Sequence, residues 1–229
     1  MVVFDIVIVT AIKVPKYMEP EIYSLFLSNV EERKKERISR FYRMEDSYRT
    51  LLGDALIRYK FKQLTGFHNN QMKIELSSYG KPYTDPSFGV HFNIAHSGDW
   101  VVSVFGETNV GIDIEEIKPI NFEIAKKYFS SREITDLTNL IDIDKKLFYF
   151  YDLWTLKESY IKAIGRGLFI PLNSFSIFMN SSKEIFIDGA ENTVFFKQYN
   201  LDCSYKLSVC SYLYEFTNTI EQCTVYDLI

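Results

Sequence analysis

The order of the predicted secondary-structure elements occurs twice in this chain of 229 residues. In each cycle a strand is followed by helices and then by several short strands; the first cycle begins with a strand at 2–9 and the second with a strand at 109–116. A helix or a sheet must bury its apolar face against another element, so this mixed order predicts an α+β fold. We therefore expect two similar α/β halves, residues 1–108 and residues 109–229.

Hydrophobic periodicity and turn signals locate the elements within each half. Apolar side chains from Tyr48 to Tyr59 recur at helical spacing, and Gly66 ends that helix. Ser130 and Glu133 have the spacing of a helix capping box. The first half is predicted to hold one or two helices in 19–42 and strands near 72–77, 90–95 and 100–105. The second half is predicted to hold helices near 121–129, 131–140 and 144–164, then strands near 174–179, 184–188, 194–199 and 205–211.

The charge of the chain argues against nucleic-acid binding. Lys and Arg number 26 against 30 Asp and Glu, a net charge of −4, whereas nucleic-acid binders are usually basic. The positive charge is concentrated, because residues 31–62 hold ten basic and six acidic side chains. A local basic face on an acidic protein suits a small phosphorylated ligand better than a polymer.

Cysteine usage and the N-terminal sequence bear on location. Cys203, Cys210 and Cys223 are odd in number and have no Cys-x-x-Cys spacing, which argues against a zinc site or a disulfide framework and fits a reducing compartment. The apolar run at the N-terminus is interrupted by Asp5 and Lys13, so it is interpreted as a strand, neither a signal peptide nor a membrane span. We expect a cytoplasmic protein that does not enter the membrane.

The segment Gly111–Glu115 (GIDIE) is the sharpest local motif. In a strand, Asp113 and Glu115 share one face, about 7 Å apart, while the isoleucines between them point to the other face. Two carboxylates at this spacing repel each other unless a cation joins them, and Mg²⁺ with phosphate and water is a natural occupant. The alternative is a solvated strand edge with its polar residues outward.

The predicted helix 144–164 carries charged residues in apolar surroundings. Glu158 falls inside an apolar stripe, Lys157 projects among apolar side chains, and Lys162 borders the stripe near Glu158. Burying the charge of Lys157 or of Glu158 without a partner is costly. The long side chains can instead extend to solvent. A site for a metal and a phosphate, completed by Glu158 together with the two strand carboxylates, is the stronger explanation.

Two further groups could contact an anion. His96 and Ser97 end a predicted strand before the turn at Gly98, where a single histidine has either a structural or a functional role. In the basic segment, Arg33, Lys34 and Arg37 are neighbours on one helix face, and Arg49 and Thr50 begin the next helix. They could hold a phosphate, or they could form a solvated face paired with nearby glutamates.

Five segments together resemble the 4′-phosphopantetheinyl transferases of the type that activates surfactin synthetase. In chain order they are Arg49–Asp54 (RTLLGD), Tyr79–Pro82 (YGKP), Phe92–Gly98 (FNIAHSG), Gly111–Glu115 (GIDIE) and Trp154–Lys162 (WTLKESYIK). Each alone is weak, whereas their order and separations are highly specific, and weak similarity extends over nearly the whole chain.

The resemblance implies an activity and an architecture. The family moves phosphopantetheine from coenzyme A to a serine of an apo acyl or peptidyl carrier protein, with Mg²⁺, and releases adenosine 3′,5′-bisphosphate. Its larger members are built from two similar halves related by a pseudo-twofold axis, with coenzyme A at the junction. The implied pathways are nonribosomal peptide, polyketide or fatty acid biosynthesis, and a monomer is expected because both halves lie in one chain.

The resemblance also implies roles for individual residues. Asp113, Glu115 and Glu158 would hold Mg²⁺, Glu158 would be the base for the carrier serine, and Lys162 would contact the pyrophosphate and stabilise the leaving phosphate. The 3′-phosphate would lie among Lys34, Arg37, Arg49, Thr50 and His96, and the adenine by Lys81. Ala95 stands where a serine is frequent in the family, which removes one side-chain hydrogen bond to coenzyme A.

Two other functions stay open at this point. One is a Mg²⁺-dependent hydrolase that cleaves a nucleotide pyrophosphate with water, and the other is a non-catalytic module that binds coenzyme A or a carrier protein. Carrier contacts are expected among aromatic residues of the second half, which could equally be core: Phe122, Tyr128, Phe129, Phe148 and Tyr149.

Overall fold

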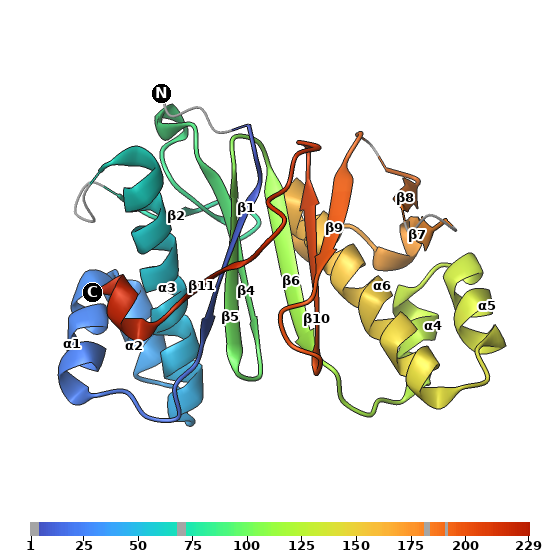
Figure 1. The fold of residues 1–229 in the computed structure, drawn as a ribbon, viewed down its shortest axis with the longest axis horizontal. Coiled ribbons are helices and arrows are strands. Elements are labelled where there is room, and N and C mark those ends of the chain that lie inside the picture. Colours follow the sequence, from blue (N-terminus) through green and yellow to red (C-terminus); the bar gives the residue numbers. More distant parts are fainter. Residues whose placement is uncertain (1–4, 68–71, 181–183, 191) are drawn as a thin grey trace.

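The computed structural model describes residues 5–67, 72–180, 184–190 and 192–229 and has the predicted α+β architecture. Two sheets lie side by side in the middle of the molecule, and the helices cover their outer sides (Figure 1). One long helix packs against each of these two larger sheets, and two further sheets have only two strands each. None of the helices in the described ranges has the length and apolar character needed to cross a membrane.

The first half follows the predicted order. Its long helix ends at Gly66, which adopts a left-handed conformation with φ of 74°. In chain order the elements are β1 (Ile8–Lys13), α1 (Pro20–Asn29), α2 (Glu32–Ile38), α3 (Met44–Thr65), β2 (Glu75–Leu76), β3 (Pro82–Tyr83), the 3-10 turn η2 (Pro86–Phe88), β4 (His91–Ser97) and β5 (Trp100–Gly106).

The second half repeats that order of strand, helices and strands. Its long helix ends at Gly165 in the same left-handed conformation, and the Ser130–Glu133 capping box is present. The elements are β6 (Val110–Glu116), η3 (Phe122–Ile124), α4 (Ala125–Tyr128), α5 (Ser131–Asn139), α6 (Ile143–Ile164), η4 (Gly167–Phe169), η5 (Leu172–Ser174), β7 (Ser176–Met179), β8 (Ile185–Asp188), β9 (Phe195–Tyr199) and β10 (Tyr205–Ser211).

Three predictions about the strands need correction. The first strand runs over Ile8–Lys13 and not over 2–9, because pairing with β5 continues to Lys13; residues 1–4 lie outside the described part. The strand β11 (Glu221–Cys223) and the short strand β3 were not predicted. β11 pairs in parallel with β1, so the chain returns to the first half, where η6 (Val225–Leu228) packs on its core.

The strand β6 and the helix α6 lie in unusually close contact because of Gly111. A Cβ at Gly111 would overlap the backbone of Ser159 and of Ala163 on α6. Only glycine permits this approach of a helix to a strand. The contact brings the last turns of α6 against the strand that carries the two carboxylates.

The two halves meet along β4 and β6, which lie side by side. Across the described residues these strands belong to separate sheets, β11-β1-β5-β4 and β6-β10-β9. Two side chains of β4 provide the link: Asn93 Oδ1 accepts from the amide of Ile112 at 3.0 Å, and Ser97 Oγ accepts from the amide of Glu116 at 3.1 Å. The equal separation of 19 residues in both contacts means that the strands run parallel.

Candidate active site at the meeting of the two halves

Asp113 and Glu115 project from one face of β6, as the alternating pattern predicts. Ile112 and Ile114 fill the core on the other face. Asp113 is buried, with 4% of its surface exposed, because the helix α6 packs against this side of the strand. The alternative of a solvated strand edge is therefore wrong for Asp113.

The helix α6 brings an ammonium group and a third carboxylate to the same place. Lys162 Nζ lies 2.6 Å from Asp113 Oδ1 and donates a hydrogen bond to it. Glu158, one turn earlier on the helix, is half-buried. Burial raises the pKa of Glu158, the charge of Asp113 raises it further, and Lys162 opposes both. The predicted residues of the strand and the helix are thus brought together.

The carboxylates of Asp113, Glu115 and Glu158 repel one another, and the single positive charge of Lys162 does not neutralise all three. Burial raises the pKa of Glu115 to about 7, and the charges of Asp113 and Glu158 add to this rise, whereas a hydrogen bond from Ser97 and the charge of Lys162 oppose it. Burial likewise raises the pKa of Asp113. Mutual repulsion of this kind is relieved by a cation or by protonation.

A magnesium ion fits the chemistry of this donor set. Asp113 Oδ2 is buried and meets no hydrogen-bond donor among the described residues. A buried carboxylate oxygen without a donor requires a partner, and hard cations take carboxylate oxygens as ligands. The carboxylates are not arranged as a ready-made centre, since in the described ranges no three His, Cys, Asp or Glu side chains are placed to hold a metal ion.

Lys157 is part of the framework beneath the site. It is fully buried, so the expectation that its side chain could extend to solvent is wrong. Its ammonium lies 2.9 Å from Glu133 and donates to the carbonyls of Leu172 and Phe175, both at 2.8 Å. Glu133 also accepts from the amides of Ser130 and Ile177. These buried interactions of Lys157 and Glu133 hold α6 against α5 and β7, next to Glu158.

The basic residues of the first half approach the carboxylates from the other side of the join. Burial lowers the pKa of His96, and the charges of Arg49, Lys162 and Arg37 lower it further, so these groups act on one another. Arg49 donates to Gly98 O at 2.8 Å and pairs with Asp46 at 2.5 Å. It thereby holds the turn that follows His96.

Other predicted anion ligands have protein partners. Thr50 Oγ1 donates to the carbonyl of Asp46 within α3. Lys34 pairs with the buried carboxylate of Asp54 at 2.5 Å, and Arg58 pairs with the other oxygen of Asp54 at 2.6 Å. A cavity of about 430 Å³ lies over this pair; its basic lining consists of Arg33, Lys34, Arg37, Arg40 and Arg58.

Lys81 fastens the hairpin β2–β3 to the second half. Its ammonium donates to Val110 O at 3.0 Å and to Ala163 O, near the end of α6, at 3.1 Å. Burial lowers the pKa of Lys81 to about 8. Lys81 also lines a cavity of about 350 Å³ with Tyr79, His91 and Arg166. Ala95, by contrast, is buried in the core between the sheets.

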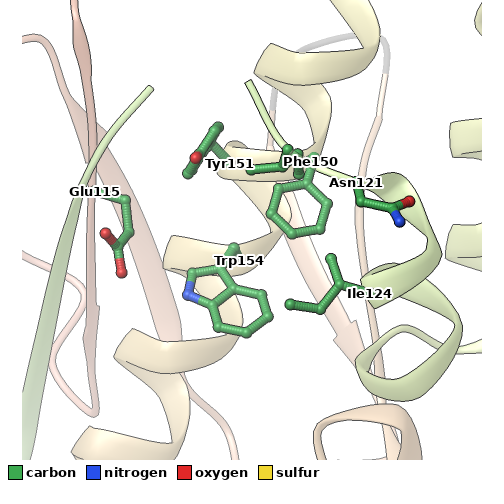
Figure 2. Close-up of a pocket in the computed structure, with 7 residues that line it drawn as sticks. Glu115, Asn121, Ile124, Phe150, Tyr151 and Trp154 are labelled. Carbon is green, nitrogen blue, oxygen red and sulfur yellow. The ribbon is translucent and has the colours of Figure 1, made fainter. Parts of the chain in front are cut away.

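An apolar cavity of about 450 Å³ opens next to Glu115 (Figure 2). Glu115 lines one side of the cavity, and Phe150, Tyr151 and Trp154 of α6 line the opposite side together with Ile124 of η3. Sequence reasoning missed Ile124 and Asn121 as lining residues. Their place in sequence between the carboxylate-bearing strand and the helix rich in aromatic residues is the signal that could have indicated them. Of the predicted aromatic contacts, Phe129 is core, whereas Phe148 is 43% exposed.

Comparison with known proteins gives concordant matches to both halves. A family model described as "4′-phosphopantetheinyl transferase, N-terminal" matches residues 18–108, and one described as "4′-phosphopantetheinyl transferase superfamily" matches residues 109–210. The chain is 38% identical over 206 residues to 4′-phosphopantetheinyl transferase Sfp of Bacillus subtilis, covering 89% of this chain and 92% of that protein.

A second relative gives a similar match. The chain is 38% identical over 208 residues to 4′-phosphopantetheinyl transferase gsp of Aneurinibacillus migulanus, covering 90% of this chain and 86% of that one. Among solved structures, a holo-(acyl-carrier-protein) synthase from Bacillus anthracis in complex with CoA matches 45% of this chain and 93% of its own, with 16% identity and a TM-score of 0.41.

Proposed function

Since this chain belongs to the 4′-phosphopantetheinyl transferase family, we propose that it transfers the 4′-phosphopantetheine group of coenzyme A to a serine of an apo carrier protein. Adenosine 3′,5′-bisphosphate is the other product. The observation that carries the assignment at the level of the site is the meeting of Lys162 with Asp113, whose second oxygen is buried without a donor.

The carboxylates would hold the metal ion. Asp113, Glu115 and Glu158 are the residues that would bind Mg²⁺, which when bound neutralises charge on the pyrophosphate. Their mutual repulsion and the unsatisfied oxygen of Asp113 support this proposal. Lys162 already stands among them and supplies a fixed positive charge for the leaving group.

The reaction forms one bond from oxygen to phosphorus and breaks another. The hydroxyl oxygen of the carrier serine attacks the phosphorus that bears pantetheine, and the bond from that phosphorus to the bridging oxygen breaks. Glu158 takes the serine proton, directly or through water, and its raised pKa brings it towards the range of an effective base. Lys162 stabilises or protonates the departing phosphate, because negative charge accumulates there.

The nucleotide end of coenzyme A would lie on the first half. We assign the 3′-phosphate to Lys34, Arg37, Arg49, Thr50 and His96, and the adenine to the neighbourhood of Lys81, with backbone contacts at Ala95. Residues 1–108 then bind the nucleotide, and residues 109–229 hold the metal and the catalytic groups. The lowered pKa of His96, to which the charges of Arg49, Lys162 and Arg37 contribute, supports the view that these regions are near each other.

We further propose a cytoplasmic monomer. The supporting observations are three free cysteines, which are typical of a reducing compartment, and a site whose two sides come from one chain.

One experiment tests this function against the alternatives. The protein is incubated with coenzyme A, Mg²⁺ and an apo carrier protein, and the carrier is weighed by mass spectrometry. A phosphopantetheine mass increment supports transfer. Free bisphosphate with an unmodified carrier would instead support a pyrophosphate-cleaving hydrolase, and no product of either kind would support a binding module.

A further inference from the structure

Ser97, the last residue of β4, links the two halves through hydrogen bonds to β6 beside the proposed metal ligand Glu115. Its hydroxyl accepts a hydrogen bond from the amide of Glu116 at 3.1 Å and donates one to Glu115 Oε2 at 3.0 Å. A serine hydroxyl can do both at once, since it carries one donor and two acceptor positions. The side chain of Glu115 is thereby tied back to its own strand through a residue of the other half.

This arrangement restricts the carboxylate of Glu115. A free glutamate side chain has several rotamers, and binding a metal ion with it requires that this freedom be lost. The amide of Glu116 fixes the oxygen of Ser97, and the hydroxyl proton is then directed to Glu115 Oε2. Hydrogen bonds in such a chain polarise and strengthen one another.

The turn that follows Ser97 is held by residues of both halves. The next residue, Gly98, has its carbonyl bound by Arg49 of the first half at 2.8 Å. The amide of Asp99 donates to the hydroxyl of Tyr205, on β10 of the second half, at 2.9 Å. The end of β4 therefore has a defined position relative to β6, which the hydroxyl of Ser97 transmits to Glu115.

We infer that Ser97 is a positioning residue that sets the orientation of Glu115 for the metal ion. The inference rests on the proposed function and adds to it a residue that is neither one of the proposed metal ligands nor one of the residues assigned to coenzyme A. Hydrogen-bond partners of metal ligands typically change metal affinity or activity by about 10–100-fold when they are removed.

Asn93 provides a matched control. It makes the same kind of link between β4 and β6, four residues earlier, by accepting from the amide of Ile112 at 3.0 Å. Unlike Ser97, it makes no hydrogen bond to a carboxylate within the described part of the chain. Loss of Asn93 weakens the join without releasing Glu115, so the two effects can be separated.

The test measures Mn²⁺ binding, by electron paramagnetic resonance of the free ion, to the protein saturated with coenzyme A. We expect Ser97→Ala to bind Mn²⁺ about tenfold more weakly than the unchanged protein. Ser97→Thr, which keeps the hydroxyl, should stay within about threefold. Asn93→Ala should lower the melting temperature and leave the Mn²⁺ constant within about threefold. The Mg²⁺ concentration for half-maximal transfer should rise in Ser97→Ala while the KM for coenzyme A does not.

Two results would overturn the inference: unchanged Mn²⁺ affinity in Ser97→Ala, or an equal loss in Asn93→Ala, which would assign the effect to the join alone. Either can occur while the unchanged protein modifies its carrier, in which case the proposed function stands. If the unchanged protein binds no Mn²⁺, the proposed metal site fails and this inference fails with it.

Discussion

Lys162 Nζ lies 2.6 Å from Asp113 Oδ1, while Oδ2 of the same carboxylate is buried without a donor among the described residues. One oxygen of Asp113 is therefore paired with an ammonium group, and the other has no partner in the described part of the chain. Both lie where the two halves meet. The uncompensated oxygen is the feature that a cation would satisfy, and Lys162 supplies only part of the charge that three carboxylates require.

Replacing Glu158 by glutamine should stop transfer and leave coenzyme A binding partly intact. The amide cannot accept the serine proton, and general bases contribute about 10²–10⁴-fold to rate. Carrier modification followed by mass spectrometry, with calorimetric titration of coenzyme A, checks both parts. Transfer at a near-normal rate would remove Glu158 as the base.

Asp113→Ala should abolish the Mg²⁺-dependent activity. It removes the oxygen that meets no donor and the carboxylate that pairs with Lys162. Transfer is measured over a range of Mg²⁺ concentrations, with a chelator as the zero point. Full turnover by the variant in the presence of chelator is incompatible with a metal site at this position.

Lys157→Met should lower the free energy of unfolding by about 3–5 kcal/mol, because it leaves Glu133 buried and unpaired. Urea denaturation measures this loss. The control is the double variant Lys157→Met with Glu133→Gln, which removes both charges and should recover part of the stability. A Lys157→Met variant as stable as the unchanged protein would mean that the buried pair does not hold α6 in place.

Lys81 should make stability rise with pH in alkaline solution. Burial lowers its pKa to about 8 in the folded protein, from 10.5 in an exposed chain. Between these values the unfolded chain holds the additional proton, so the free energy of unfolding increases with pH in that window and the charge-burial cost is fully present below it. The contribution is up to about 2 kcal/mol between pH 7.5 and 9.5.

The measurement is urea denaturation of the unchanged protein and of Lys81→Met at several pH values in this range. The difference between the two free energies isolates Lys81 from tyrosines and cysteines that titrate nearby. We expect that difference to grow in favour of the unchanged protein as pH rises. A constant difference would mean that the carbonyls of Val110 and Ala163 keep the ammonium at its ordinary pKa.

Local patterns predicted most elements of the fold because each rests on neighbours in sequence. The stripe from Tyr48 to Tyr59 became α3, and glycines at positions 66 and 165 end the two long helices. The strand β11 was missed because a pairing of three residues with β1 has no local signature. Its position depends on a contact more than 200 residues away in sequence.

The sequence predicted which charged residues gather at the site, but it did not predict which partners hold them in place. Alternation along β6 put Asp113 and Glu115 on one face, and the structure agrees. The partner of Lys157 could not be predicted, because Glu133 was visible only as a capping residue and its second contact is a tertiary one. The role of Ser97 was hidden for the same reason, since its two partners lie on a strand of the other half.

Both ends of the described chain lie on the first half, since β1 pairs with β11 there (Figure 1). The second half is therefore an insertion within the first in topological terms. During synthesis, the first sheet can acquire its edge strand only after the whole second half has left the ribosome. The strand β10 ends at Ser211 and β11 begins only at Glu221, so the sheet that carries the carboxylates receives its last strand before the other sheet receives its edge strand.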